Sequence, residues 1–449
     1  MSEWKKVKIG DICKIVKGIT GIASAEPGEY PLVVTAEERK TCSTYQFDCE
    51  AVCIPLVSSS GHGKKSLKNV HYQSGKFALG TILCAVIPNN PQELDARYLH
   101  QYLQFYKDII LVPLMKGAAN VSLSMKDIAT VEFPLPPIER QRELSNLFVS
   151  LQEKQKELSA EYEKQTEYAK LLRQNILQQA IEGKLTADWR NQNPVQKGNP
   201  DYDAEALFEQ IQKDRINYWK QNTSKETKNK DLLPIDEFNS SFPETWKRTC
   251  LIELFDFVDY RGITPKKLES GIPLITAANI KEGFLSFESK DFISDSEYEL
   301  RNSRGITTKY DLLFTTEAPM GHCAINTLEK TSCGQRVITL KKYSNINKRQ
   351  FNTFYCYYII SSIFQDLLLQ KATGITAKGI KASILKVIPV YLPPLKEQEE
   401  IVNKVENLLA KVTALENQIK DRKSLSEKLI FGIIKEKLEV KNDNLSGNN

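Results

Sequence analysis

Short clusters of basic, amide and hydroxyl side chains occur beside predicted turns in both halves of this chain. Arginine and lysine can donate to guanine edges, glutamine can pair with adenine edges, and lysine, serine and threonine hold phosphates. The candidates in the first half are Lys17, Thr20, His62, Lys64, Lys65 and Lys116. Those in the second half are Arg261, Thr264, Lys266, Lys267, His322, Gln335, Arg336, Thr373, Thr376 and Lys378. Each alone could be an ordinary solvated side chain, but their clustering predicts contact with nucleic acid.

The sequence offers little for catalysis. "GHGKKS" at 61–66 lacks the spacing of a phosphate-binding loop and is interpreted as a polar turn. The double-proline junctions "LPPI" and "LPPL" lack the polar side chain and the aromatic that an amino-methyltransferase site needs. Asp311 and Glu317 are isolated acids, whereas a metal-dependent nuclease needs a cluster. A serine–histidine–aspartate arrangement stays open, but nothing marks a nucleophile, so we expect no catalysis, metal or cofactor in this chain.

The composition is typical of a soluble globular protein, with 41% hydrophobic and 26% charged residues in a chain of 449. This length suggests two or three domains. The net charge of +5 permits nucleic-acid binding without indicating it. No apolar run approaches the ~18 residues of a membrane span, and the start lacks a signal-peptide pattern. The nine cysteines show no metal-binding pairs and indicate reduced thiols, so we predict a cytoplasmic protein without membrane contact.

The chain contains an internal repeat, which decides its domain organisation. "EWKKVKIGDICKIVKGIT" at 3–20 resembles "TWKRTCLIELFDFVDYRGIT" at 245–264, and Trp246 follows Trp4 by 242 positions. "LPPIERQREL" and "LPPLKEQEEI" lie 257 positions apart, so the second copy has gained 15 residues in between. Short β-rich runs and a helical stretch in each copy predict two mixed α/β domains.

After each proline junction, apolar residues spaced by four and three predict a helix of about 45 residues. Adding 257 to the positions of the first stripe gives the second. The predicted seam residues are Leu144, Phe148, Leu151, Leu158 and Leu172 in the first helix and Ile401, Val405, Leu408, Leu415 and Leu429 in the second. We expect the helices to form an antiparallel coiled coil with one globular domain at each end.

The predicted fold class is therefore α+β, with two mixed α/β domains in tandem, two long helices and a pseudo-twofold internal repeat. The predicted segments are residues 1–137 and 244–394 as domains, 138–188 and 395–440 as helices, 189–243 as a linker with a short helix, and 441–449 as a disordered tail.

Several segments together resemble the specificity subunit of type I restriction–modification enzymes. Besides the two proline junctions, the resemblance rests on "VDYRGITPKKL" at 258–268, "TTEAPMGHCAI" at 315–325, "GQRVITL" at 334–340 and "GKLTADWRNQNP" at 183–194. Together these segments cover nearly the whole chain. The first half lacks a good match to "APMGH", and "VSSSGHGKKS" at 57–66 is the candidate counterpart.

The resemblance implies that each domain is a target-recognition domain reading one half of a bipartite, asymmetric sequence in double-stranded DNA. The helices would set the spacing and dock two modification subunits, which carry adenine-N6 methyltransferase chemistry and bind S-adenosylmethionine. Restriction subunits with translocase and nuclease activity that uses ATP and Mg would join them, and this chain would be non-catalytic. The alternative is a coiled-coil scaffold whose globular ends bind protein. A steep fall of DNA affinity with salt distinguishes the two.

Overall fold

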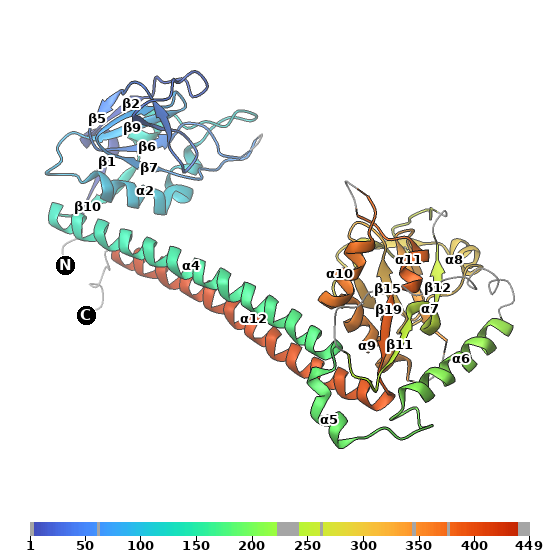
Figure 1. Ribbon diagram of the computed structural model, residues 1–449. Coiled ribbons are helices and arrows are strands. Elements are labelled where there is room, and N and C mark those ends of the chain that lie inside the picture. Colours follow the sequence, from blue (N-terminus) through green and yellow to red (C-terminus); the bar gives the residue numbers. More distant parts are fainter. Residues whose placement is uncertain are drawn as a thin grey trace, which may run out of the picture. The chain divides into compact units, whose positions relative to one another are not determined.

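The computed structural model describes residues 4–60, 63–221, 242–260, 264–343, 347–374 and 378–438 (Figure 1). The chain divides into two compact units. The first unit comprises residues 1–163 and 420–449, and the second comprises residues 164–419. Each unit contains one mixed α/β domain and part of each of two long helices, and each is described by itself. The predicted tail at 441–449 and the polar linker segment 222–241 lie outside the described residues.

The first unit contains two four-stranded sheets, ordered β2-β9-β6-β7 and β4-β3-β8-β5, and a separate β1-β10 pair. The strands are β1 Lys5–Lys8, β2 Cys13–Lys17, β3 Tyr30–Val33, β4 Lys40–Cys42, β5 Phe47–Asp48, β6 Ala51–Pro55, β7 His71–Gln73, β8 Lys76–Leu79, β9 Leu83–Pro88 and β10 Glu132–Leu135. The helices of this domain are α1 Ile9–Ile12, α2 Ala96–Ile110, η1 Val112–Leu114 and α3 Met125–Ala129. Asp95 caps α2 by accepting hydrogen bonds from the backbone of Arg97 and Tyr98.

The second unit repeats this plan, with sheets ordered β12-β18-β15-β16 and β14-β13-β17 and a β11-β19 pair. The strands are β11 Lys247–Cys250, β12 Phe255–Asp259, β13 Ile272–Ile275, β14 Asp291–Ile293, β15 Leu312–Thr315, β16 Cys323–Ile325, β17 Ser332–Cys333, β18 Val337–Lys342 and β19 Pro389–Leu392. The helices are η2 Lys184–Thr186, α5 Ala187–Gln192, α6 Ala204–Gln221, α7 Leu251–Leu254, η4 Ala277–Asn279, α8 Asp295–Asn302, α9 Lys348–Ile360, α10 Ser362–Lys371 and α11 Ala382–Val387.

The strand registers of the two domains correspond, which confirms the internal repeat. The parallel pair β3-β8 aligns Leu32 with Ala78, and its counterpart β13-β17 aligns Leu274 with Ser332. Residues added in the second copy fall in connections between strands, and one addition is α8 between β14 and β15. Loop length varies because loops carry few pairing constraints, whereas a slip of one residue would turn a strand's buried side chains to solvent.

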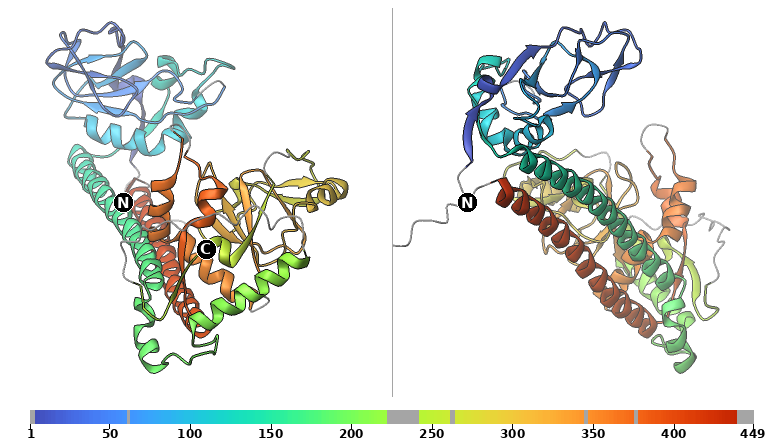
Figure 2. Two further views of the ribbon diagram at one scale, coloured as in Figure 1. Left: turned by 45° about the vertical axis from the view of Figure 1, so that its right-hand side comes forward. Right: turned by 90° about the vertical axis from the view of Figure 1, so that its left-hand side faces the viewer.

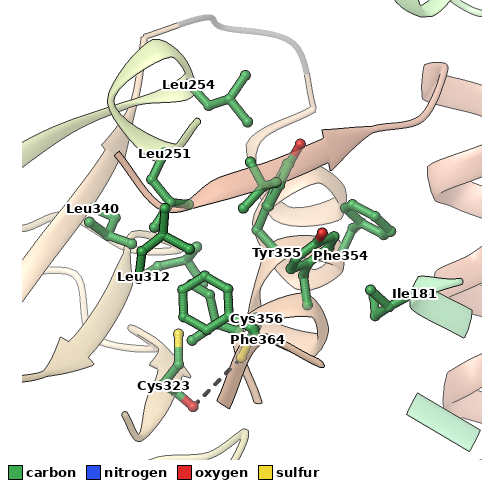
Figure 3. Close-up of a cluster of buried hydrophobic side chains, with 14 of the residues drawn as sticks. Ile181, Leu251, Leu254, Leu312, Cys323, Leu340, Phe354, Tyr355, Cys356 and Phe364 are labelled. Carbon is green, nitrogen blue, oxygen red and sulfur yellow. Dashed lines mark hydrogen bonds between the residues drawn. The ribbon is translucent and has the colours of Figure 1, made fainter. Parts of the chain in front are cut away.

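The core of the second domain lies on both faces of its larger sheet, and Figure 3 shows the cluster on one of these faces. Strand β15 reads Leu-Leu-Phe-Thr and is buried throughout. Leu312 and Phe314 pack in the cluster that contains Phe354 of α9, whereas Leu313 packs in a separate cluster on the opposite face. Alternating side chains of a strand point to opposite faces, so a continuous apolar strand indicates a sheet covered on both sides.

The two long helices are α4 (Ile138–Ile181) and α12 (Leu395–Leu438), and each contains 44 residues. In the second unit, Nη2 of Arg173 lies 3.0 Å from Oε2 of Glu416, and Nζ of Lys404 donates to the carbonyl of Leu185 at 3.0 Å. Leu185 belongs to η2, just beyond the end of α4. The position further along this part of the chain therefore contacts the earlier residue of α12, so the helices are antiparallel (Figure 2).

The antiparallel pairing also holds in the first unit. There Phe148 and Leu151 of α4 belong to the same hydrophobic cluster as Ile434 and Leu438 of α12. The ring of Phe431 lies 4.7 Å from that of Phe105 in α2, so α12 also contacts the first domain. The C-terminal part of α12 therefore completes the core of the first unit.

The helix contact differs from the predicted seam at Leu172, Leu415 and Leu429, which are 48%, 48% and 62% exposed. Of the other predicted seam residues, Leu144, Phe148, Ile401 and Val405 are buried, and Leu151, Leu158 and Leu408 are partly buried. An α-helix drifts by ~20° per heptad against a strict seven-residue repeat. Arg173 and Glu416 therefore pair between the helices beside the positions expected for Leu172 and Leu415, and Ile430 is buried where Leu429 was expected.

The repeated proline junction joins each domain to its long helix through a buried glutamine. The Nε2 atoms of Gln141 and Gln398 donate to the carbonyls of Pro136 and Pro393, each at 2.7 Å. Gln141 also accepts a hydrogen bond from the backbone of Asp95, the residue that caps α2. A buried backbone carbonyl needs a donor, and the glutamine of the first helical turn supplies one to the first proline of each junction.

A buried carboxylate at the second junction connects four segments. Glu397 is fully buried in the first turn of α12, and it accepts hydrogen bonds from Thr186 at 2.7 Å and from the indole of Trp246 at 2.8 Å. Arg190 of α5 pairs with the same carboxylate. This Glu397 cluster fastens η2, α5 and the start of β11 to α12. At the equivalent position of the first junction, Arg140 makes only an exposed pair with Glu143.

Candidate nucleic-acid interface

The candidate residues gather where strands end at one side of a four-stranded sheet in each domain, β2-β9-β6-β7 in the first and β12-β18-β15-β16 in the second. In the first domain β2 and β6 both run antiparallel to β9, so they end at the same side. There Lys17 pairs with Cys84, and Pro55 pairs with Leu83. We call this the first edge; it comprises residues 17–20, 56–60, 63–66, 80–82 and 116–122.

The turn after β2 is held in place by neighbouring polar groups. Gln46 donates from Nε2 to the carbonyl of Lys17 at 2.9 Å and accepts from the backbone of Ile19 at 3.1 Å. A Cβ on Gly18 would lie 2.2 Å from the carbonyl oxygen of Gly80, so only glycine fits there. The chain therefore presents Lys17 and Ile19 in a defined conformation, with Ile19 73% exposed.

Two further loops meet at the first edge. Ser122 forms β-bridges with Val57 and with Lys116, so the loop after β6 lies against the segment before α3. The hydroxyl of Ser58 donates to the carbonyl of Lys64. Lys64 and Lys65 are both exposed, and Lys64 lines a hollow of about 260 Å³ together with residues of both loops. Hydroxyls, exposed amines and a hollow of this kind suit a phosphate group.

The second domain forms the same arrangement where β12 and β15 end beside the start of β18. We call this the second edge; it comprises residues 264–267, 316–322, 334–336, 373–374 and 378–380. Gly379 forms β-bridges with Glu317 and Thr373. The Nε2 of Gln335 donates to the hydroxyl of Thr264, and Nε of Arg336 lies 3.2 Å from Oε1 of Glu317.

The two edges correspond residue by residue. Leu56 donates its backbone N–H to Ile82 at 2.8 Å, and Thr316 donates to Arg336 at 2.9 Å. The bridges of Ser122 with Val57 and of Gly379 with Glu317 also correspond. "VSSSGHGKKS" therefore begins at the place where "EAPMGH" begins in the second copy, although the sequences differ.

The edges contain most of the described candidate residues, but three point elsewhere. Lys267 pairs with Asp291 of β14 at 2.7 Å, and Nδ1 of His322 lies 3.1 Å from the carbonyl of Ile280. Lys116 lies at the first edge, but its amine pairs with Asp127 at 3.1 Å. Hydrogen bonds from Ser124 and Lys116 lower the pKa of Asp127.

Thr20, Lys17, Lys64 and Lys65 lie at the first edge, and Thr264, Lys266, Gln335, Arg336, Thr373 and Lys378 lie at the second. His62, Arg261 and Thr376 lie outside the described residues.

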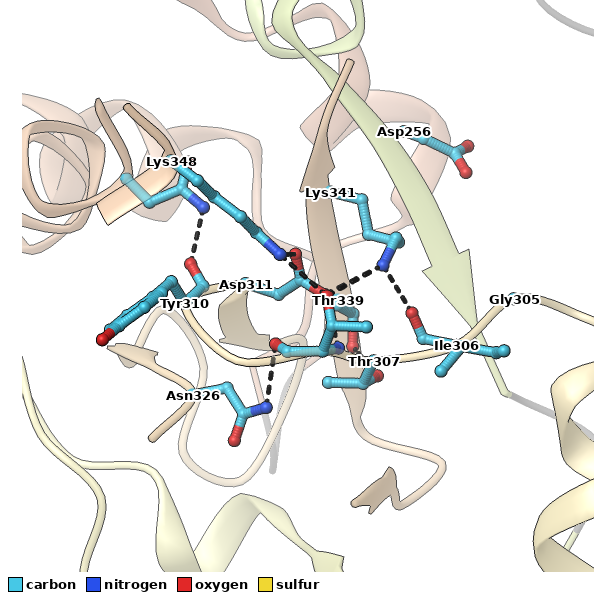
Figure 4. A network of polar contacts seen from close by, with 12 residues as sticks. Asp256, Gly305, Ile306, Thr307, Tyr310, Asp311, Asn326, Thr339, Lys341 and Lys348 are labelled. Carbon is cyan, nitrogen blue, oxygen red and sulfur yellow. Dashed lines mark hydrogen bonds and ion pairs between the residues drawn. The ribbon is translucent and has the colours of Figure 1, made fainter. Parts of the chain in front are cut away.

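The acids considered for catalysis occupy different places. Asp311 is fully buried, and its two oxygens pair with Lys341 at 3.0 Å and Lys348 at 2.6 Å (Figure 4). Its partners also include the backbone and hydroxyl of Thr308, so this carboxylate joins the turn before β15 to β18 and α9. Glu317 is instead exposed at the second edge, a position that its sequence context did not predict.

Two other observations bear on function. Within the described ranges, no group of three or more histidine, cysteine, aspartate or glutamate side chains is arranged to hold a metal ion. No helix in those same ranges combines the length and apolar character needed to cross a membrane.

This chain is similar in sequence to known proteins. The family model of the type I restriction modification DNA specificity domain matches residues 1–167 and 243–422. The EcoDI specificity subunit of Escherichia coli is 23% identical over 424 residues, covering 93% of this chain and 84% of the relative. The EcoKI specificity subunit of Escherichia coli strain K12 is 23% identical over 313 residues, and the match covers 56% of that relative.

Solved structures show the same fold. A chain from a type I R-M system, whose structure concerns complex assembly and conformational transition, aligns with a TM-score of 0.65 at 16% identity, and the match covers 98% of each chain. The HsdS subunit from Thermoanaerobacter tengcongensis aligns with a TM-score of 0.51 at 14% identity, over 98% of this chain and 97% of that chain.

Proposed function

Because this chain belongs to the family of type I restriction–modification DNA specificity domains, we propose that its two edges each read one half of a bipartite sequence in double-stranded DNA. The observation that supports this most is the duplicated edge. The same backbone arrangement occurs twice and carries different side chains, such as Val57 and Ile82 in one copy and Glu317 and Arg336 at the corresponding positions of the other. Different side chains on one scaffold would select different half-sites.

The long helices would set the separation of the half-sites and dock two modification subunits. Leu172, Leu415 and Leu429 expose large apolar side chains on α4 and α12 within the described residues, and exposed apolar surface is a common site of protein association. The modification subunits would bind S-adenosylmethionine and methylate adenine, and restriction subunits would supply the chemistry that uses ATP and Mg. This chain would contribute sequence choice and no catalytic group.

A domain exchange tests the proposal. Residues 1–137 are replaced by the matching domain of a relative with a known target, and adenine methylation is mapped across the genome of cells that carry the complex. We expect one half of the methylated sequence to change and the other half to stay the same. A change of both halves together would contradict independent reading by the two domains.

Binding in solution tests the alternative, a scaffold that binds only protein. We expect the assembled methyltransferase to bind duplex DNA with an affinity that falls steeply with salt, because phosphate contacts release counterions. Replacement of either domain by its matching relative should keep this salt dependence. Absence of DNA binding at low salt would favour the scaffold.

A further inference from the structure

An acidic side chain lies in the middle of the second edge. Oε1 of Glu317 is 3.2 Å from Nε of Arg336, and the two side chains are 50% and 57% exposed. A carboxylate here opposes the approach of DNA phosphates, and an exposed ion pair adds little to folding stability. Neither general affinity nor stability therefore explains why an acid occupies this position.

The backbone on both sides of Glu317 is fixed by neighbouring segments. The preceding residue, Thr316, donates its N–H to the carbonyl of Arg336 at 2.9 Å and accepts from the N–H of Ile380 at 3.0 Å. A Cβ on Gly379 would lie 3.4 Å from the Cβ of Glu317. Glu317 is thus held between the strand end that carries Arg336 and the loop that carries Lys378.

The internal repeat shows what occupies this pair of positions in the other domain. Val57 forms the bridge that corresponds to that of Glu317, and Ile82 accepts the backbone bond that corresponds to that of Arg336. Both first-domain residues are apolar and partly buried. The two positions therefore differ together, as an acid with a base in one domain and as two aliphatic residues in the other.

An arginine that reads guanine donates two hydrogen bonds from its planar guanidinium to O6 and N7. Holding that plane in advance reduces the ordering cost of binding. The carboxylate of Glu317, beside Nε of Arg336, is positioned to hold the guanidinium plane in this way. Resting on the function proposed above, we propose that Glu317 is a positioning residue that orients Arg336 to read a guanine of the second half-site.

The test uses the chain in complex with its modification subunits. The target is first mapped by adenine methylation, and binding is then measured by competition against duplexes that each carry one changed base pair. Arg336→Ala should lose about five- to 150-fold of the discrimination at one base pair, which corresponds to the ordinary range for a bidentate contact. Glu317→Gln should lose part of the discrimination at that same base pair, and Glu317→Asp should restore some of it.

The double variant separates positioning from a structural role. If Glu317 acts through Arg336, then Glu317→Gln should add no further loss in the Arg336→Ala background. Glu329→Gln is the matched control, because Glu329 also forms an exposed pair with a basic side chain, that of Lys309 at 2.6 Å, beyond the opposite ends of β15 and β16. This control changes the charge by the same amount and should keep full discrimination.

Three results would overturn the inference: unchanged discrimination in Glu317→Gln, an equal change of affinity for all duplexes, or additive losses in the double variant. A different result would count against the proposed function itself. If the complexes with the unsubstituted chain and with Glu329→Gln bind every duplex equally well, then the chain selects no DNA sequence.

Discussion

Replacing Glu397 by alanine should strongly destabilise the second unit. The carboxylate is fully buried and holds the Arg190 guanidinium, the Trp246 indole and the Thr186 hydroxyl. Removing it leaves a largely buried positive charge and two buried donors without their acceptor. Breaking a buried pair in this way costs about 3–5 kcal/mol, which corresponds to a fall in Tm of roughly 6–20 °C for a unit of this size.

Tryptophan fluorescence during urea denaturation is a suitable assay, because Trp189, Trp219 and Trp246 all belong to the second unit. Glu397→Gln should lose less than Glu397→Ala, since the amide oxygen can still accept from one donor. Glu399→Ala is the control, because Glu399 lies two residues after Glu397 and makes only an exposed pair, with Lys396, among the described ion pairs. It should leave the denaturation midpoint unchanged. A loss below about 1 kcal/mol in Glu397→Ala would refute the reasoning, since even one unsatisfied buried donor costs more.

Three further predictions concern the first edge, the first domain and the helices. Replacing Lys64 and Lys65 by alanine should lower the slope of log affinity against log salt by about 0.9 for each phosphate that these lysines neutralise, while competition binding shows unchanged base preferences. Burial and the nearby Arg39 lower the pKa of His71 from 6.5 to about 4, so the folded state keeps this ring neutral while the unfolded state protonates it. The stability of the first unit should therefore fall as the pH drops from about 6.5 toward 4, and His71→Asn should reduce that slope in denaturation measurements. Four residues inserted after Glu163 and four after Ile419 would lengthen each helix by ~6 Å. Methylation mapping should then find the two half-sites one or two base pairs further apart, with the same bases in each. An unchanged gap with activity retained would contradict the proposed role of the helices in spacing.

Much of the fold could be predicted from patterns of residues that are close together in the sequence. The repeat, the proline junctions and the two mixed α/β domains were predictable because each depends on residues close in sequence. The double proline followed by Gln141 or Gln398 is such a signal, since the glutamine satisfies a carbonyl only five residues earlier. The long helices were predictable for the same reason, because a sustained apolar stripe specifies a helix without knowledge of its partner.

Features that depend on distant segments were harder to predict. The strict heptad placed Leu172 in the helix contact, whereas the structure places Arg173 there beside Glu416. Sequence spacing alone could not give the small rotation of each helix about its axis, and this rotation decides which of two adjacent residues faces the partner helix. Glu317 was considered only as a catalytic acid, because its proximity to Arg336 arises from the pairing of β15 with β18. A comparison of the two copies at this pair could have identified it.

The division of the chain has a consequence for its synthesis. The second unit is continuous in sequence, whereas the core of the first unit includes Leu438, which follows residue 163 by 275 positions. At ~5–20 residues per second, the ribosome needs about 15–55 s to supply that helix. During this interval the apolar face around Phe105 and Phe148 has no covering helix. The domain translated first is therefore the last to be completed, and nascent chains should depend on chaperones at this face more than at any part of the second unit.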